Sequence, residues 1–220
     1  MVSQTTLFRK ARHDIFLARA RHSLNFPCMK HRLFSNPKTE RSVFFLIWFW
    51  YFLLYSFLGF LLEVAFARAT HGRPERKCFL LLPLCPVYGL GACGILLLPE
   101  PIRSRPVLLF LFGGLTATAV EYVTALFYER ILRVSFWDYR GLPGNIDGRV
   151  CLPFSLIWGA LSLPLVFRLH PAIRSFPAAI PFPVTLTAAV LLAADCAVSA
   201  ALLYAAGSPA CLNWYGSKEK

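Results

Sequence analysis

The sequence has few charged residues and lacks the usual catalytic and nucleotide-binding signatures. Only 15% of its 220 residues are Asp, Glu, Lys or Arg, whereas 57% are hydrophobic, and the mean hydropathy is +0.55. Soluble domains typically carry about 25% charged residues, so the composition indicates a membrane protein. There is no G-x-x-x-x-G-K-[ST] loop and no H-E-x-x-H pair. We therefore expect no bound nucleotide, and we assign no catalytic residue.

Metal and nucleic-acid partners are also not expected. The seven cysteines are an odd number without C-x-x-C spacing, which predicts neither a zinc site nor a disulfide framework, although a pairing of Cys85 with Cys151 stays open. We expect no cofactor. The net charge of +12 comes mainly from the N-terminal tail and the short loops. No nucleic-acid-binding motif accompanies it, so lipid phosphates are the expected partner.

The chain divides into a tail, a membrane domain and a second tail. Residues 1–42 hold nine Lys or Arg and form either a basic amphipathic helix on the membrane surface or a poorly ordered tail. No apolar segment precedes a small-residue cleavage site there, so we expect no removable signal peptide. Residues 43–206 form the predicted transmembrane domain, and residues 207–220 form the C-terminal tail.

Five apolar blocks predict an all-α, polytopic helical bundle. Roughly 20 helical residues cross a hydrocarbon layer of about 30 Å, and blocks of about this length cover Val43–Ala67, Cys78–Leu98, Val107–Phe127, Val150–Leu169 and about Ala178–Ala206. The second block is interrupted by Pro83, Pro86 and three glycines. It is either a broken, re-entrant segment or a proline-kinked packing helix.

Three acidic residues lie inside these apolar blocks, namely Glu63, Glu121 and Asp195. Ionised residues at the bilayer centre cost roughly 2.5 to 3.5 kcal/mol each on insertion scales, so all three are expected to face the bundle interior. Alternating spans place them in one half of the membrane, together with Arg149 and beneath a loop at residues 136–148. Arg149 is expected to pair with Glu121 or Glu129. A substrate cavity, a purely structural ion-pair network and protonated acids all remain open.

Several segments resemble one known family. They read YSFLGFLLE at 55–63, FLLLPLCPVYGLG at 79–91, AVEYVT at 119–124, WDY at 137–139 and NIDGRVCLPFSLIWG at 145–159. From about Phe45 to Pro171 the chain resembles the ABC-transporter permeases of the CmpB type, also called type IV. The resemblance implies a polytopic membrane protein of a mainly bacterial family whose animal relatives have no assigned role. This chain has Leu81 and Leu82 where the family usually has Asn-Gly.

The candidate residues form two sets. The residues expected to bind in a polar cavity are Glu63, Glu121, Arg149, Asp195, Asp138, Asn145, Tyr88 and Ser155. The residues that match family motifs, and that are expected to shape the bundle, are Gly59, Pro83, Pro86, Gly89, Trp137, Tyr139, Gly148 and Trp158.

The leading functional hypothesis is a membrane-embedded, permease-like component of an ABC-type transporter, with a polar cavity for a small cationic solute or for a proton relay. Its expected partner is the lipid bilayer, and a separate ATPase subunit and a homo-oligomer are both left open. We expect it in the cell membrane with a cytoplasmic N-terminus. A lipid-binding protein, a membrane enzyme and a membrane scaffold or assembly factor remain as alternatives.

Overall fold

The computed structural model describes residues 37–70 and 78–212. The chain separates into two units, residues 1–47 and 48–220. The described part of the first unit is the beginning of helix α2 (Pro37–Ala69). The second unit contains the rest of α2 and every element discussed below. The expectation of a surface-lying or unordered tail concerns residues 1–36, which lie outside the described residues.

Regular structure in the described residues is helical, apart from an isolated bridge between Ile146 and Val150. Proline lies in the first turn of each helix from α3 to α8, where its missing N–H leaves no hydrogen bond unmade. After α2 the helices are α3 (Pro86–Leu96), α4 (Glu100–Arg103), α5 (Pro106–Phe127), α6 (Leu152–Pro164), α7 (His170–Ile173) and α8 (Phe182–Ala206). Single π-turns continue α5 as η1 (Tyr128–Leu132) and α6 as η2 (Leu165–Leu169).

Four helical stretches are long and apolar enough to cross a membrane, namely Ser42–Ala69, Pro106–Leu132, Leu152–Ala179 and Phe182–Ala206. The second of the five predicted spans, Cys78–Leu98, is the broken one of the two alternatives left open, because residues 78–85 are not helical and α3 has only 11 residues. At 1.5 Å per residue, α3 reaches about half of a bilayer's hydrocarbon thickness. The all-α polytopic class is thereby confirmed, and the chain is a multi-pass membrane protein.

Small residues bring the helices close together. A Cβ on Gly59 of α2 would overlap the side chain of Tyr88 of α3, and a Cβ on Gly89 would lie 2.6 Å from a backbone oxygen of α2. Between α5 and α6, a Cβ on Gly114 would lie 3.1 Å from the Cα of Gly159. Backbone approach of this kind is how helices gain packing energy in lipid, where burial of apolar surface from water contributes little.

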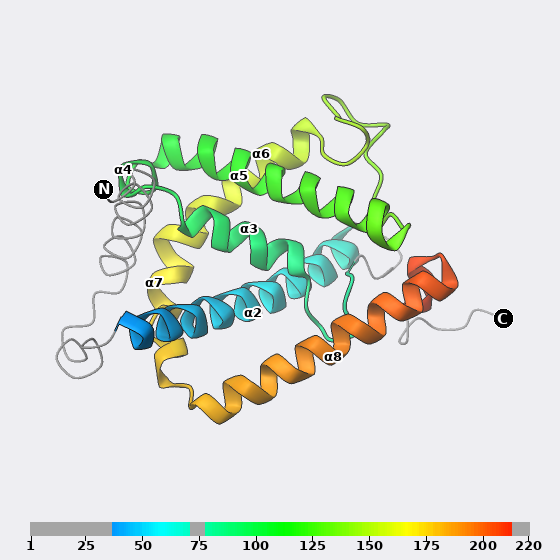
Figure 1. Ribbon diagram of the computed structural model, residues 1–220. Helices are drawn as coiled ribbons and strands as arrows, with labels where there is room; N and C mark the ends of the chain where they lie inside the picture. The colour runs from blue at the N-terminus through cyan, green and yellow to red at the C-terminus, as the bar shows by residue number, and fades with distance from the viewer. Residues whose placement is uncertain (1–36, 71–77, 213–220) are drawn as a thin grey trace, which may run out of the picture. The chain divides into compact units, whose positions relative to one another are not determined.

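The direction of the chain determines which helix ends meet. Figure 1 shows it reversing between α3 and α5, between α5 and α6, and again before α8. The C-terminal half of α5 therefore lies near the beginning of α6, and the loop at residues 133–151 connects them. This end of the second unit contains most of the residues singled out from the sequence.

Candidate functional site

Two carboxylates and three aromatic side chains form two hydrogen-bonded sets that are joined by a ring contact, and together we call them the carboxylate–aromatic cluster. The phenol of Tyr88 donates to Glu63 Oε1 at 2.6 Å. Trp158 Nε1 donates to Glu121 Oε2 at 2.8 Å, and the phenol of Tyr139 donates to Glu121 Oε1 at 3.0 Å. The rings of Tyr88 and Trp158 meet edge to face, with centroids 5.0 Å apart. Four helices and one loop thus contribute to a single cluster.

Among the described residues, neither carboxylate of the cluster has a basic partner. Glu121 is only 4% exposed, and within residues 37–70 and 78–212 no Lys or Arg forms an ion pair with it or with Glu63. Hydrogen bonds from neutral aromatic donors are therefore their main stabilisation. Burial, together with the negative charge of Glu121, raises the pKa of the Tyr139 phenol, so this phenol stays protonated and able to donate.

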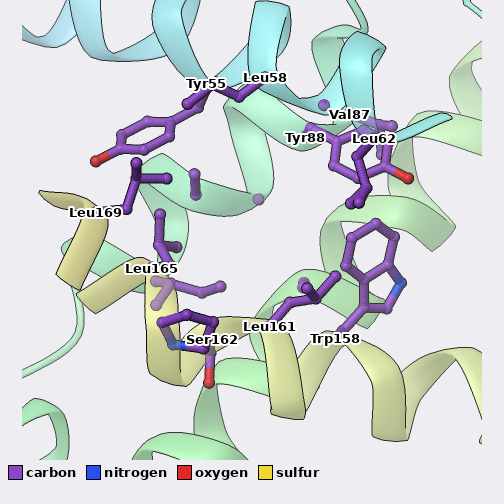
Figure 2. A pocket seen from close by; sticks show the side chains of 16 residues that line it. Tyr55, Leu58, Leu62, Val87, Tyr88, Trp158, Leu161, Ser162, Leu165 and Leu169 are labelled. Atoms are coloured by element: carbon purple, nitrogen blue, oxygen red, sulfur yellow. The ribbon is translucent and has the colours of Figure 1, made fainter. Parts of the chain in front are cut away.

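A cavity of about 260 Å³ lies beside the cluster, between α2, α3 and α6 (Figure 2). Its walls are mainly aliphatic, and the rings of Tyr88 and Trp158 line one end. Tyr55 lies at the opposite end, where its hydroxyl is 2.9 Å from His170 Nδ1. Leu62 also lines the cavity and is 40% exposed, so the cavity reaches the surface of the helices. The interior is apolar, and the polar groups are concentrated at its two ends.

One face of α2 carries a sequence pattern that indicates this cavity. The residues of α2 that line it are Tyr55, Leu58, Gly59 and Leu62, which follow the i, i+3, i+4, i+7 spacing of one helix face. In a helix that is apolar on all sides, such a face does not stand out by hydropathy. A small residue beside an aromatic residue on one face was the available indication.

Arg149 forms a second group at the loop, separate from the cavity. Its guanidinium donates to Glu129 Oε2 at 2.7 and 2.9 Å and to Asp147 Oδ2 at 2.7 Å. It also donates to the hydroxyl of Tyr122 at 3.1 Å. Of the two partners expected for Arg149, the structure selects Glu129, and Glu121 is left to the aromatic donors. The hydrogen bonds to Glu129 raise the pKa of the guanidinium further, so the group is a permanent cation that ties the loop to α5.

The polar residues of the loop mainly hold the loop itself. Asp138 accepts the backbone N–H of Arg140 at 3.0 Å, and Asn145 Nδ2 donates to two loop carbonyls, at 2.9 and 3.1 Å. Gly148 has φ of 71°, and a Cβ there would lie 2.7 Å from Asp138 Oδ1, so glycine is required. Asp138 and Asn145 are exposed and do not line the cavity, in contrast to their expected position.

Asp195 forms a third group, and its partners are backbone donors. Its two oxygens accept the N–H groups of Leu81 and Leu82, each at 3.0 Å. Ser199 donates to the same carboxylate at 3.3 Å. Residues 78–85 are not helical, so in a lipid environment their N–H groups need hydrogen-bond acceptors from other parts of the protein. Asp195 supplies two of these acceptors. Asp195 thus fastens the broken segment to α8, and it does not line the cavity.

The other predicted residues have local roles. Ser155 Oγ donates to the Cys151 carbonyl at 2.9 Å and accepts from Thr118 at 3.0 Å. Trp137 Nε1 donates to the Arg149 carbonyl at 2.9 Å. Pro86 begins α3, and Pro83 is exposed in the non-helical segment before it. Cys85 and Cys151, the pairing left open, are both buried and do not form a disulfide with each other.

The predicted residues therefore occupy three groups, where a single polar pocket was expected. The alternating topology carries them to one end of the second unit, but each acid finds a different type of partner. Glu63 and Glu121 accept from aromatic donors, and Asp195 accepts from backbone N–H groups. The cavity adjoins only the first of these groups.

One family model matches the chain. It covers residues 50–200, well over half of the sequence, and is described as "Putative ABC-transporter type IV". The chain belongs to this family, in agreement with the resemblance of its motifs. No curated protein and no solved structure matches the chain.

Proposed function

We propose that this chain is the membrane-embedded, permease-like component of a transporter, and that its ligand occupies the cavity between α2, α3 and α6. The observation that carries the proposal is the position of the carboxylate–aromatic cluster at one end of that cavity. Acidic residues inside a bundle of transmembrane helices commonly mark ion or substrate pathways. Membership of the family supports the same class of function.

A transporter of this class requires an energy source outside the chain. The sequence has no phosphate-binding loop, so we propose that a separate ATPase subunit docks on it. The connection between α3 and α5 contains only the four-residue helix α4, in which Arg103 pairs with Glu100 at 2.7 Å. Such a short element offers little docking surface, so the association is proposed to be weak. Co-purification of an ATPase subunit in mild detergent tests this part.

The decisive experiment separates a ligand site from a packing device. Glu63→Gln and Glu121→Gln keep the size of each side chain and remove its charge. We expect both variants to reach the membrane at normal abundance and to lose function, scored as growth or as solute accumulation. Glu100→Gln, at a carboxylate that is 65% exposed, is the matched control and should retain function.

A different outcome would favour the scaffold alternative. If both cluster variants lower membrane abundance as strongly as Asp195→Asn does, the carboxylates specify helix packing, and the proposed ligand site is wrong. A lipid-binding protein is the second candidate, and the apolar walls of the cavity favour it. In that case the variants would lose bound lipid while no solute moves.

A further inference from the structure

The cavity and the cluster beside it together define a ligand class. The carboxylates do not line the cavity; they lie one hydrogen bond behind the two rings that do. The ligand therefore meets aliphatic side chains along most of its length and meets Tyr88 and Trp158 at one end. Any positive charge at that end would face both aromatic rings and, behind them, two carboxylates.

Hydrogen bonding prepares these two rings for a cation. Aromatic faces carry negative charge density and attract ammonium groups, indole most strongly, and cages of such rings recognise quaternary ammonium ligands. Tyr88 and Trp158 each donate their polar hydrogen to a carboxylate, which increases the electron density of the ring. The two rings meet edge to face at an interplanar angle of 70°, and both line the same end of the cavity.

Other ligand classes fit less well. A small hydrated cation would have to give up its water, because the cavity offers no set of oxygen ligands, and among the described residues no three His, Cys, Asp or Glu side chains gather to hold a metal ion. An anion would face Glu63 and Glu121 without a counter-charge, since Arg149 is already paired with Glu129 and Asp147. A neutral apolar ligand would gain no electrostatic attraction from the carboxylates of the cluster.

We propose that the cavity binds a cationic amphiphile, with its apolar chain between α2, α3 and α6 and its protonated amine or quaternary ammonium group against Tyr88 and Trp158. This inference rests on the proposed function, because it names the substrate class of the same site. At about 260 Å³ the cavity is larger than the ~150 Å³ cavity that holds a benzene molecule, so it has room for an apolar chain.

The test is a binding measurement on the full chain in nanodiscs of phosphatidylcholine, with empty nanodiscs subtracted. The probes share one decyl chain and differ in the head group: radiolabelled decyltrimethylammonium, with decanol and decyl sulfate as competitors. We expect the cation to bind about ten-fold or more tightly than decanol, and decyl sulfate not to compete. Equal binding of decanol and the cation, or competition by decyl sulfate, would overturn the proposal.

Variants locate the two parts of the ligand. Glu63→Gln combined with Glu121→Gln should abolish the preference for the cation, and Tyr88→Phe should weaken that preference without changing any charge. Leu165→Phe, within the cavity wall, should weaken all probes alike, whereas Leu156→Phe, at an exposed position of α6, should weaken none. A preference that survives in the double variant would contradict the assigned head-group site.

This assay needs neither an ATPase nor net transport, so it separates the two proposals. Binding of the cation without transport would refute the permease role and leave the ligand class standing. Transport of another solute by a chain that shows no head-group preference would refute the ligand class and leave the permease role standing.

Discussion

Replacing Asp195 by Asn should open the broken segment at residues 78–85. The amide has one acceptor oxygen, so one of the two N–H groups now bound by the carboxylate loses its bond to residue 195. Loss of a hydrogen bond to a charged group costs up to about 3 kcal/mol, and changing the other hydrogen bond from charged to neutral costs about 1 kcal/mol more. Removing the charge of Asp195 does not offset this loss of free energy. The carboxylate stays in the membrane as part of α8 whether the segment is packed or open, so the cost of placing its charge there is the same in both states.

The expected loss for Asp195→Asn is therefore about 2–4 kcal/mol, which corresponds to roughly 30- to 1,000-fold more of the open segment. Two buried thiols report on that population. Cys78 and Cys85, at the ends of the segment, are each 2% exposed. Their reaction with a maleimide should accelerate by this factor, because labelling follows the open population when opening is fast relative to reaction. Site-resolved mass spectrometry measures each cysteine separately.

Two controls define the result for the segment. Cys151 is 1% exposed and lies at the start of α6, so its labelling reports unfolding beyond the segment and should stay slow. Ser199→Ala leaves both carboxylate acceptors in place and should change the labelling of Cys78 and Cys85 less than ten-fold. If Asp195→Asn labels these two cysteines within about three-fold of the unchanged chain, the fastening role of the carboxylate is refuted.

Three further outcomes are expected. Gly89→Ala should lower the free energy of unfolding by about 1–3 kcal/mol, because the added Cβ meets α2. Gly91→Ala, where the nearest atom would be 3.9 Å from the added Cβ, should change it by less than about 0.5 kcal/mol. Equal melting temperatures of the two variants would contradict the packing of α3 against α2. Arg149→Lys should make the loop at 133–151 more sensitive to protease, since lysine lacks the planar fork, while Arg140→Lys, at an 80% exposed side chain, should not. The folded state raises the pKa of Tyr139 above the ordinary tyrosine value of 10.0. The stability that Tyr139 contributes should therefore be complete below pH 10.0 and decline as the pH rises above it. In melting curves, Tyr139→Phe should remove this loss of stability at alkaline pH.

The architecture was predictable because it rests on length, hydropathy and proline. Apolar blocks of sufficient length gave the spans, and the proline and glycine residues of the block at Cys78–Leu98 indicated the break. Helix ends were less predictable. The helical stretch predicted as Val150–Leu169 continues to Ala179, because a π-turn follows Pro164 and Pro171 falls in the first turn of α7, where a proline needs no donor.

The partners of the acids were not predictable from the sequence. Topology alone placed Glu63 and Glu121 at one end of the second unit, but whether each meets a cation or an aromatic donor depends on helix rotation. A helix that is hydrophobic on all sides has no amphipathic pattern, so its rotation about its own axis cannot be predicted from hydropathy. Arg149 had two carboxylates within reach of its loop, and the sequence does not show that Glu129 is half-buried in the π-turn η1 while Glu121 is buried in α5.

Asp195 also accounts for the departure of this chain from its family at residues 81 and 82. The family usually has Asn-Gly there, and this chain has Leu81 and Leu82. The carboxylate binds the backbone N–H groups of both residues, and every residue except proline supplies that donor. The side chains at these positions can therefore vary while the fastening persists, whereas a proline at either position would remove a donor. The acid in α8 thus fastens a non-helical backbone segment, and the proposed ligand site depends on Glu63 and Glu121 instead.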